Sequence, residues 1–274
     1  MEIQIVHAAR WRVASPVTGK EAGKTKTVLT DFLIGLDAKY QRSAEGMLAL
    51  IKRAADLVHG PLGLGRELCH PANTAAPSDT VYELIKGDLR VFFFLDGQDR
   101  IMVCACGTLK KGRRADPQKV AEAERMRTLV SKRQARRAIE TERGRMTMTA
   151  FSDLLRSAEE RDSYWAEHAK LDFAIDLNRV MGINGLRKSD LAARLGKSPA
   201  YVTKVLRGDA NLTIESMVSL ARAAGGTLHI HIAPQTASVR WFNILGQKSA
   251  PESTALDWAH IARNPSHGQR PLAA

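Results

Sequence analysis

The segment SDLAARLGKSPAYVTKVLRGDANLT, residues 189–213, constrains the fold of this 274-residue chain more than any other. Apolar residues recur at helical spacing on both sides of Gly196, and Ser198 stands where a helix cap is expected. We therefore predict two short helices joined by a tight glycine turn. Their predicted inner residues are Leu191, Ala192 and Leu195 in the first helix and Val202, Val205 and Leu206 in the second.

This arrangement is a helix-turn-helix, whose second helix is built to enter the major groove of DNA. Its outward residues carry small, hydrogen-bonding and cationic groups suited to base edges and phosphates. The pattern of Asp190–Thr213 resembles the XRE/Cro-type repressors nearly throughout, and a plain three-helix bundle is the alternative. The candidate DNA-binding residues are Lys188, Lys197, Ser198, Ala200, Tyr201, Thr203, Lys204 and Arg207.

The charge of the chain is basic and unevenly distributed. A formal net charge of +12 points to a polyanionic partner, most often nucleic acid. Residues 107–145 alone hold 13 Lys+Arg against 5 Asp+Glu, a basic stripe that would also fit a solvated helix face. Residues 150–185 are acidic instead, with 7 Asp+Glu against 4 Lys+Arg.

Composition predicts a cytoplasmic protein. Three cysteines, Cys69, Cys104 and Cys106, are too few for a disulfide framework and favour a reducing compartment. Cys104 and Cys106 are expected on one face of a strand, where a buried structural role is favoured over a metal-ligand role. The N-terminus lacks the apolar core of a signal peptide, and no run of eighteen apolar residues occurs. We expect no membrane association, no metal and no cofactor.

The first part of the chain has an α+β pattern. A strand is predicted at 3–6, two helices within 29–60 and a loop over 60–79, while 7–27 is too polar and broken to assign. The runs TVYELIKG, LRVFFFLDG and RIMVCACGTL, separated by Gly- and Asp-containing turns, predict an antiparallel meander. Asp116-Pro117 then opens a basic helix.

These elements resemble the RelE/HigB group of bacterial toxins, in the branch related to a phage protein. The similarity covers roughly residues 25–130 and rests on Tyr82-Glu83-Leu84, Arg90-Val91-Phe92-Phe93, and Leu109-Lys110-Lys111 ahead of Pro117. Leu109 stands where the group has phenylalanine, and Ile85-Lys86 where it commonly has arginine. The resemblance implies a metal-independent, ribosome-associated endoribonuclease that cuts mRNA.

Cleavage of RNA by its own 2′-hydroxyl requires proton transfer and stabilisation of charge on phosphorus, which clustered cations can supply. We expect such cations to converge at one edge of the sheet, although lysines at a solvated strand edge are the alternative. Glu83 is interpreted as a structural partner of Arg90 rather than a base, and His7, His59 and His70 as surface or capping residues. The candidate catalytic residues are Lys86, Arg90, Lys110 and Lys111, and the candidate RNA-binding residues are Arg66, Arg113 and Arg114.

The stretch RGRMTMTAFSDLLRSAEE, residues 143–160, resembles the start of a second protein, with Met146 and Met148 ahead of a helical run. The acidic residues that follow could lie against the basic stripe and neutralise it, with Tyr164 and Trp165 as anchors or as part of the bundle's own core. In HigBA-type and Tad–Ata-type operons a toxin gene precedes an XRE antitoxin gene. The order of the two parts therefore resembles a fused toxin–antitoxin.

The predicted architecture has two domains and a linker. Residues 1–130 are a RelE-like domain of two helices on a small antiparallel sheet, 131–150 the linker, and 151–274 the antitoxin. The antitoxin is all-α, with its helix-turn-helix at about 171–226, before a β hairpin formed by TLHIHIAP and VRWFNILG. Repressors of this type bind palindromic operators as dimers, so a homodimer is expected.

Three functions remain open from the sequence. The first is a self-inhibited endoribonuclease whose partners are mRNA and the ribosome, fused to an antitoxin that binds operator DNA. The second is a DNA-binding repressor with a catalytically dead toxin-like domain, supported by the changed positions Ile85 and Leu109. The third is an RNA-binding regulator without cleavage, supported by the basic stripe alone.

Overall fold

A computed structural model describes residues 2–21, 23–76, 79–96, 100–110, 112, 115–130 and 150–232. Residues Met1–Leu228 form one compact unit, and His229–Ala274 are a separate one. In the part of the chain that the structure describes, no helix has the length and apolarity needed to cross a membrane.

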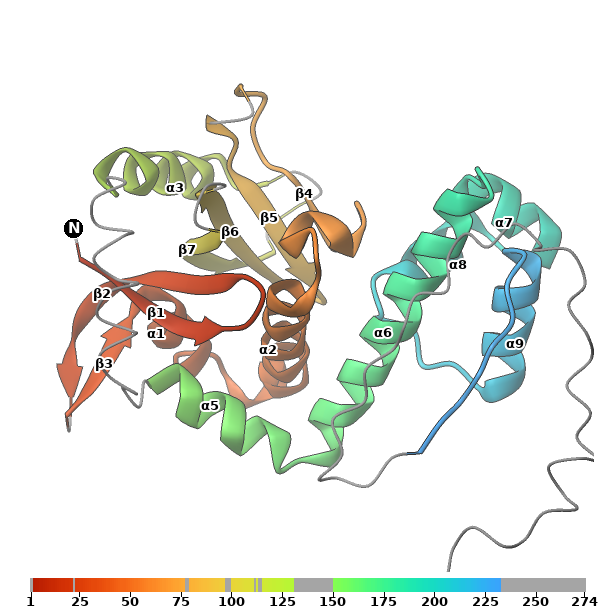
Figure 1. The fold of residues 1–274 in the computed structure, drawn as a ribbon, viewed down its shortest axis with the longest axis horizontal. Coiled ribbons are helices and arrows are strands. Elements are labelled where there is room, and N and C mark those ends of the chain that lie inside the picture. Colours follow the sequence, from red (N-terminus) through yellow and green to blue (C-terminus); the bar gives the residue numbers. More distant parts are fainter. Residues whose placement is uncertain are drawn as a thin grey trace, which may run out of the picture. The chain divides into compact units, whose positions relative to one another are not determined.

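A seven-stranded mixed sheet is the centre of the N-terminal part (Figure 1). Its strand order is β1-β2-β7-β6-β5-β4, and β3 pairs with β2. The pair β2–β7 is parallel, and the other pairs are antiparallel. The strands are β1 (Ile3–Ala8), β2 (Arg12–Glu21), β3 (Lys24–Thr27), β4 (Cys69–Pro71), β5 (Tyr82–Lys86), β6 (Leu89–Asp96) and β7 (Ile101–Leu109).

The predicted meander is confirmed as β5, β6 and β7, with a hairpin turn at Gly87-Asp88 between Lys86 and Leu89. The prediction of a small, wholly antiparallel sheet is wrong, because the unassigned segment 7–27 contains β2 and β3, and β2 pairs in parallel with β7. The prediction that 60–79 is loop throughout is also wrong. This segment contains a short 3₁₀ helix, η2 (Gly60–Leu64), and the edge strand β4.

Helices cover both faces of the sheet. On one face α1 and α2 pack with the apolar residues of what we call the α2-side core, including Leu84, Val91 and Phe93. On the other face α3 packs with the α3-side core, including Phe92 and Phe94. Strand β6 is therefore buried from both sides, as its apolar run VFFF requires. The helices are α1 (Val28–Ile34), η1 (Ala38–Tyr40), α2 (Gln41–Asp56) and α3 (Pro117–Leu129).

Cys104 and Cys106 are buried and free, but they do not share a face of β7. The register with β6 shifts between Phe92 and Phe93, whose partners are Cys106 and Cys104, so Ala105 lies in a bulge. As a result Cys104 joins the α2-side core and Cys106 the α3-side core. Burial raises the pKa of both thiols to about 12, which suits a structural role.

The acidic arm folds as α5 (Ala150–Glu159) and α6 (Asp162–Ile183), and it completes the α2-side core. Phe151, Leu155, Ala158, Tyr164, Leu171 and Ile175 all belong to that core. The segment from Leu171 to Leu177 is divided between two cores. Leu177 does pack in the bundle, whereas Leu171 and Ile175 pack against the first part of the chain.

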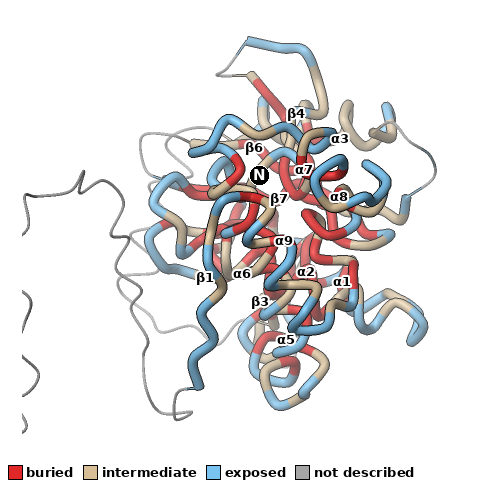
Figure 2. Tube along the Cα trace, turned by 90° about the vertical axis from the view of Figure 1, so that its right-hand side faces the viewer, coloured by how far each residue is buried: buried red, intermediate tan, exposed pale blue. Residues whose placement is uncertain are grey.

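The repressor part consists of the second half of α6 with α7 (Lys188–Leu195), α8 (Pro199–Leu206) and α9 (Ile214–Ala223). Of the predicted inner residues, Leu195 is half-buried against the core of this part, and the other five are buried in it: Leu191, Ala192, Val202, Val205 and Leu206. Figure 2 shows buried stretches alternating with exposed ones along the helices, as expected where each helix presents one side to a core. Residues 227–232 are not a strand, so the predicted hairpin is wrong at TLHIHI, and VRWFNILG lies outside the described residues.

Tyr164 and its neighbour Trp165 offer a matched test of how firmly the arm is anchored. Tyr164 is fully buried, while Trp165 is 51% exposed. We expect Tyr164→Ala to lower the free energy of unfolding by about 3–5 kcal/mol, because it leaves a large cavity in the α2-side core. Trp165→Ala should cost less than about 1 kcal/mol. Chemical denaturation of both variants measures the difference, and equal losses would contradict the anchoring role of Tyr164.

Candidate nucleic-acid interface

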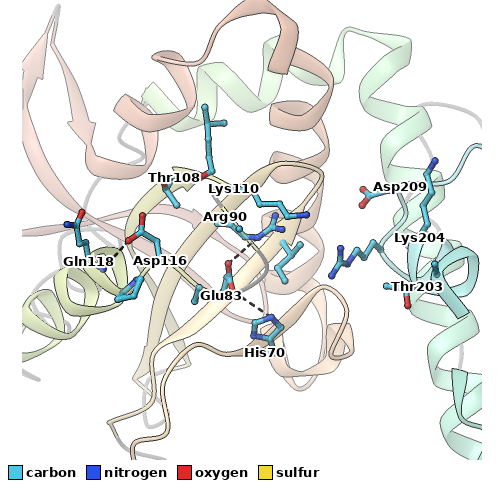
Figure 3. Close-up of a pocket in the computed structure, with 17 residues that line it drawn as sticks. His70, Glu83, Arg90, Thr108, Lys110, Asp116, Gln118, Thr203, Lys204 and Asp209 are labelled. Carbon is cyan, nitrogen blue, oxygen red and sulfur yellow. Dashed lines mark hydrogen bonds and ion pairs between the residues drawn. The ribbon is translucent and has the colours of Figure 1, made fainter.

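A cavity of about 1360 Å³ lies between the sheet and α8. From the first part it is lined by residues of β4 to β7 and by the N-terminal end of α3. From the repressor part it is lined by Ala200, Thr203, Lys204, Arg207 and Asp209. Figure 3 shows Arg90 and Lys110 on the sheet side of this cavity and Thr203, Lys204 and Asp209 on the other.

Glu83, Arg90 and His70 form a cluster on the sheet wall of the cavity (Figure 3). Glu83 on β5 and Arg90 on β6 share the α3-facing side of the sheet, and Arg90 Nε lies 3.1 Å from Glu83 Oε1. The Arg90 guanidinium also donates to the carbonyl oxygens of Gly87 and Leu89, which fixes its position. His70 Nε2 on β4 lies 3.6 Å from Glu83 Oε2. The predicted pairing of Glu83 with Arg90 is confirmed.

Burial dominates the electrostatics of this pair. It raises the pKa of Glu83 above its ordinary value, although the charges of His70, Arg90 and Arg207 act in the opposite direction. Burial also lowers the pKa of Arg90, against the influence of Glu83. Both charged forms are thus disfavoured by desolvation, and the attraction between them only partly offsets that cost.

Lys86 does not join Arg90, so the predicted convergence of these two cations is wrong. Successive residues of a strand point to opposite faces, and Lys86 follows Ile85, the partner of Arg90. Its side chain is 2% exposed, and its Nζ lies 2.8 Å from Glu167, 2.8 Å from the carbonyl oxygen of Gly208 and 3.4 Å from Asp209. Lys86 therefore joins the first part to the repressor part and has no access to a substrate.

The other predicted RNA-contacting residues separate into three groups. Lys110 is exposed and lines the cavity near Arg90. Arg66 is exposed but does not line the cavity. Lys111, Arg113 and Arg114 lie outside the described residues. A catalytic role stays a prediction for Arg90, Lys110 and Lys111.

The local geometry of the turn presents one side of α8 to the cavity. Gly196 ends α7 in the left-handed conformation, with φ +61°, and the Ser198 hydroxyl caps α8 by accepting from the Tyr201 amide at 3.2 Å. Of the candidate DNA-binding residues, Ala200, Thr203, Lys204 and Arg207 line the cavity. Lys197, Ser198 and Tyr201 do not, and Lys188 pairs with Glu67 outside it.

Four of the seven carboxylates of the acidic arm form ion pairs with the first part of the chain. Asp153 pairs with Lys24 at 2.5 Å, Glu159 with Lys52 at 2.5 Å, Asp172 with Arg53 at 2.9 Å, and Glu167 with Lys86 at 2.8 Å. None of these four cations belongs to the predicted basic stripe at 107–145. Among the described residues, these four pairs join the arm to cations of β3, α2 and β5, because α5 and α6 pack on the α2-facing side of the sheet.

Sequence reasoning missed three residues of this interface. His70 was expected to be a surface or capping residue, yet it lies beside Glu83 because β4 pairs with β5. Glu67 forms ion pairs with both Lys188 and Arg207. Asp209 accepts a hydrogen bond from the backbone amide of Gly87. Glu67 and Asp209 make contacts more than a hundred residues away in sequence, so no local pattern could have indicated them.

Comparison with known proteins identifies one segment of the chain. Residues 182–230 match the helix-turn-helix family model, which supports an XRE-type DNA-binding regulator in this segment. Neither the curated proteins nor the solved structures contain a match.

The raised pKa of Glu83 gives a pH test of the buried cluster. The folded state holds the carboxyl proton of Glu83 more tightly than the unfolded state does. The protonated Glu83 therefore contributes its full stabilisation below the ordinary glutamate pKa, and this stabilisation is lost as the pH rises through the raised pKa. The free energy of unfolding of the original chain should therefore fall, relative to that of Glu83→Gln, as the pH rises from below the ordinary glutamate pKa through the raised one. Denaturation curves across this range measure the gap, and a gap independent of pH would contradict the burial of an ionisable carboxyl.

Proposed function

We propose that this chain is a fused toxin–antitoxin: a DNA-binding regulator of the XRE helix-turn-helix type joined to an RNA-cleaving domain that it keeps inactive. The observation that carries the proposal is the shared cavity. Arg90 and Lys110, the candidate phosphate-stabilising residues, face Lys204 and Arg207 of the repressor part across it. In this arrangement α8 covers the surface that an RNA strand would have to reach.

The chemistry proposed for the first part is metal-independent cleavage of mRNA that is bound to the ribosome. The guanidinium of Arg90, fixed by two carbonyl oxygens and Glu83, would stabilise the extra negative charge on phosphorus. Lys110 is exposed at the end of β7 and would bind a neighbouring phosphate. Lys86 takes no part in this chemistry, because its ammonium is buried against Glu167.

For the repressor part we propose binding to an operator as a homodimer. Ile214 and Val218 lie one turn apart on α9 and are 60% and 39% exposed, an apolar pair that a second copy could cover. The outward residues of α8 would then read two half-sites about one helical turn apart.

A second candidate function is a DNA-binding repressor whose first domain has no catalytic activity. It is favoured by the burial of Arg90, which is only 7% exposed even though it lines the cavity. The two candidates differ in what removal of the helix-turn-helix does to the cell.

Truncation after Ile183 tests the RNA-cleaving activity. This variant retains α5 and α6, which complete the α2-side core, and lacks α8, which covers the cavity. We expect residues 1–183 to arrest growth and to cleave transcripts, whereas the full chain at the same level does neither. Growth curves and mapping of transcript ends provide the measurement.

Arg90→Ala within residues 1–183 is the matched control for that experiment. It should restore growth, because a loss of transition-state charge stabilisation typically slows cleavage by about 10²–10³-fold. If residues 1–183 are folded by circular dichroism and leave transcripts intact, the RNA-cleaving proposal fails and the second candidate remains.

Lys204→Ala tests the DNA-binding face. Lys204 is exposed on α8, so its loss should weaken binding to duplex DNA and reduce the slope of log affinity against log salt by about 1. Lys39→Ala removes an equally positive side chain that is 67% exposed and far from α8 in sequence. Titrations at several salt concentrations compare the two, and equal effects would reject the assignment of α8 as the recognition helix.

A further inference from the structure

The cavity and the recognition face of α8 are the same surface. Four of the candidate DNA-binding residues, Ala200, Thr203, Lys204 and Arg207, line the cavity together with Arg90 and Lys110. We call this the closed arrangement. In it, the side of α8 that would read DNA faces the sheet of the same chain.

A DNA duplex does not fit in the closed arrangement. The cavity that lies between the sheet and α8 has a volume of only about 1360 Å³. The major groove alone is roughly 12 Å wide, and its two flanking backbones must pass on either side of the inserted helix. For α8 to enter the groove, the sheet must therefore move away from it.

Glu67 holds two candidate DNA-binding cations in the closed arrangement. Its carboxylate pairs with Lys188 of α7 and lies 3.8 Å from Nε of Arg207 at the end of α8. A carboxylate between two cations that would otherwise contact DNA occupies the position of a backbone phosphate. Glu67 is carried on the loop before β4, so it leaves these cations when the two parts separate.

We propose that DNA and the sheet compete for the same face of α8, so that binding of operator DNA opens the chain and uncovers the cavity. By linkage, whatever stabilises the closed arrangement weakens DNA binding by the same factor. This inference rests on the DNA-binding role of α8 within the proposed function and does not require the first part to cleave RNA. Where it does cleave RNA, DNA binding and access of RNA to Arg90 are coupled.

The amide of Gly87 reports directly on opening. As the first residue of a two-residue hairpin turn, Gly87 has no partner for its N–H within the strand ladder. It donates instead to Asp209 of the repressor part at 3.3 Å. The amide of Ile85, by contrast, donates to the carbonyl oxygen of Leu68 within the first part at 2.9 Å, and it is the internal control.

The test is hydrogen exchange of the full chain with and without DNA. The probe is a duplex selected by the full chain from a random library of about 25 base pairs, which accommodates two half-sites one helical turn apart. We expect the Gly87 amide to exchange at least about tenfold faster with the duplex bound, while the Ile85 amide is unchanged. Bound duplex with unchanged exchange at Gly87 would overturn the inference and leave DNA binding intact. If no duplex is selected or bound, both the inference and the repressor role fail.

A matched pair of variants gives a second measurement. Glu67→Gln removes the carboxylate that pairs with Lys188 and Arg207. We expect this variant to bind the duplex about threefold more tightly, because the loss of weak ion pairs destabilises the closed arrangement by a corresponding amount. Asp37→Asn removes the same charge from an aspartate that is 72% exposed and pairs with Lys39, so it should leave the affinity unchanged. Equal affinities for both variants would show that Glu67 does not compete with DNA.

Discussion

The arrangement of the two parts depends on the buried ammonium of Lys86. Removing this charge from water is costly, and three groups of the downstream part offset the cost: Glu167, Asp209 and the carbonyl oxygen of Gly208. Burial raises the pKa of Glu167, but the charges and hydrogen bonds of Lys86 and Lys170 outweigh it and hold this pKa below its ordinary value. A buried ion pair of this kind specifies one arrangement more than it adds net stability. If the helix-turn-helix separates from the sheet, water can replace Asp209 and the carbonyl oxygen of Gly208, while Glu167 on α6 stays paired with Lys86.

The downstream part is thus attached in two physically different ways. α5 and the first half of α6 contribute large apolar side chains, such as Phe151 and Tyr164, to the α2-side core, and they cannot leave without exposing it. α8 of the helix-turn-helix, in contrast, meets the sheet through charged groups around the cavity. The arm is therefore a permanent part of the first domain's structure, while the helix-turn-helix is the separable element. Loss of the arm is not needed for opening.

Local patterns predicted most of the elements but not the contacts between them. The helix-turn-helix and the β5–β7 meander follow from apolar periodicity and turn residues close in sequence. β2 escaped prediction because its polar run RVASPVTGKE is stabilised by pairing with β7, some ninety residues away. Lys86 was placed with Arg90 because both are cations near one hairpin, whereas strand alternation puts them on opposite faces. The bulge at Ala105 likewise separates Cys104 from Cys106, and no sequence signal marks it.

Charge balance in the cavity explains why a polyanion is the natural ligand for opening. In the part of the chain that the structure describes, the lining brings together four cations, Arg90, Lys110, Lys204 and Arg207, and three carboxylates, Glu83, Asp116 and Asp209. Two surfaces that each attract nucleic acid would repel one another, so closure requires carboxylates such as Glu67 and Asp209 at the contact. A duplex offers phosphates in place of those carboxylates and releases its own counterions in doing so. The free energy that opens the cavity is thus electrostatic, and salt weakens the closed contacts and the DNA contacts together.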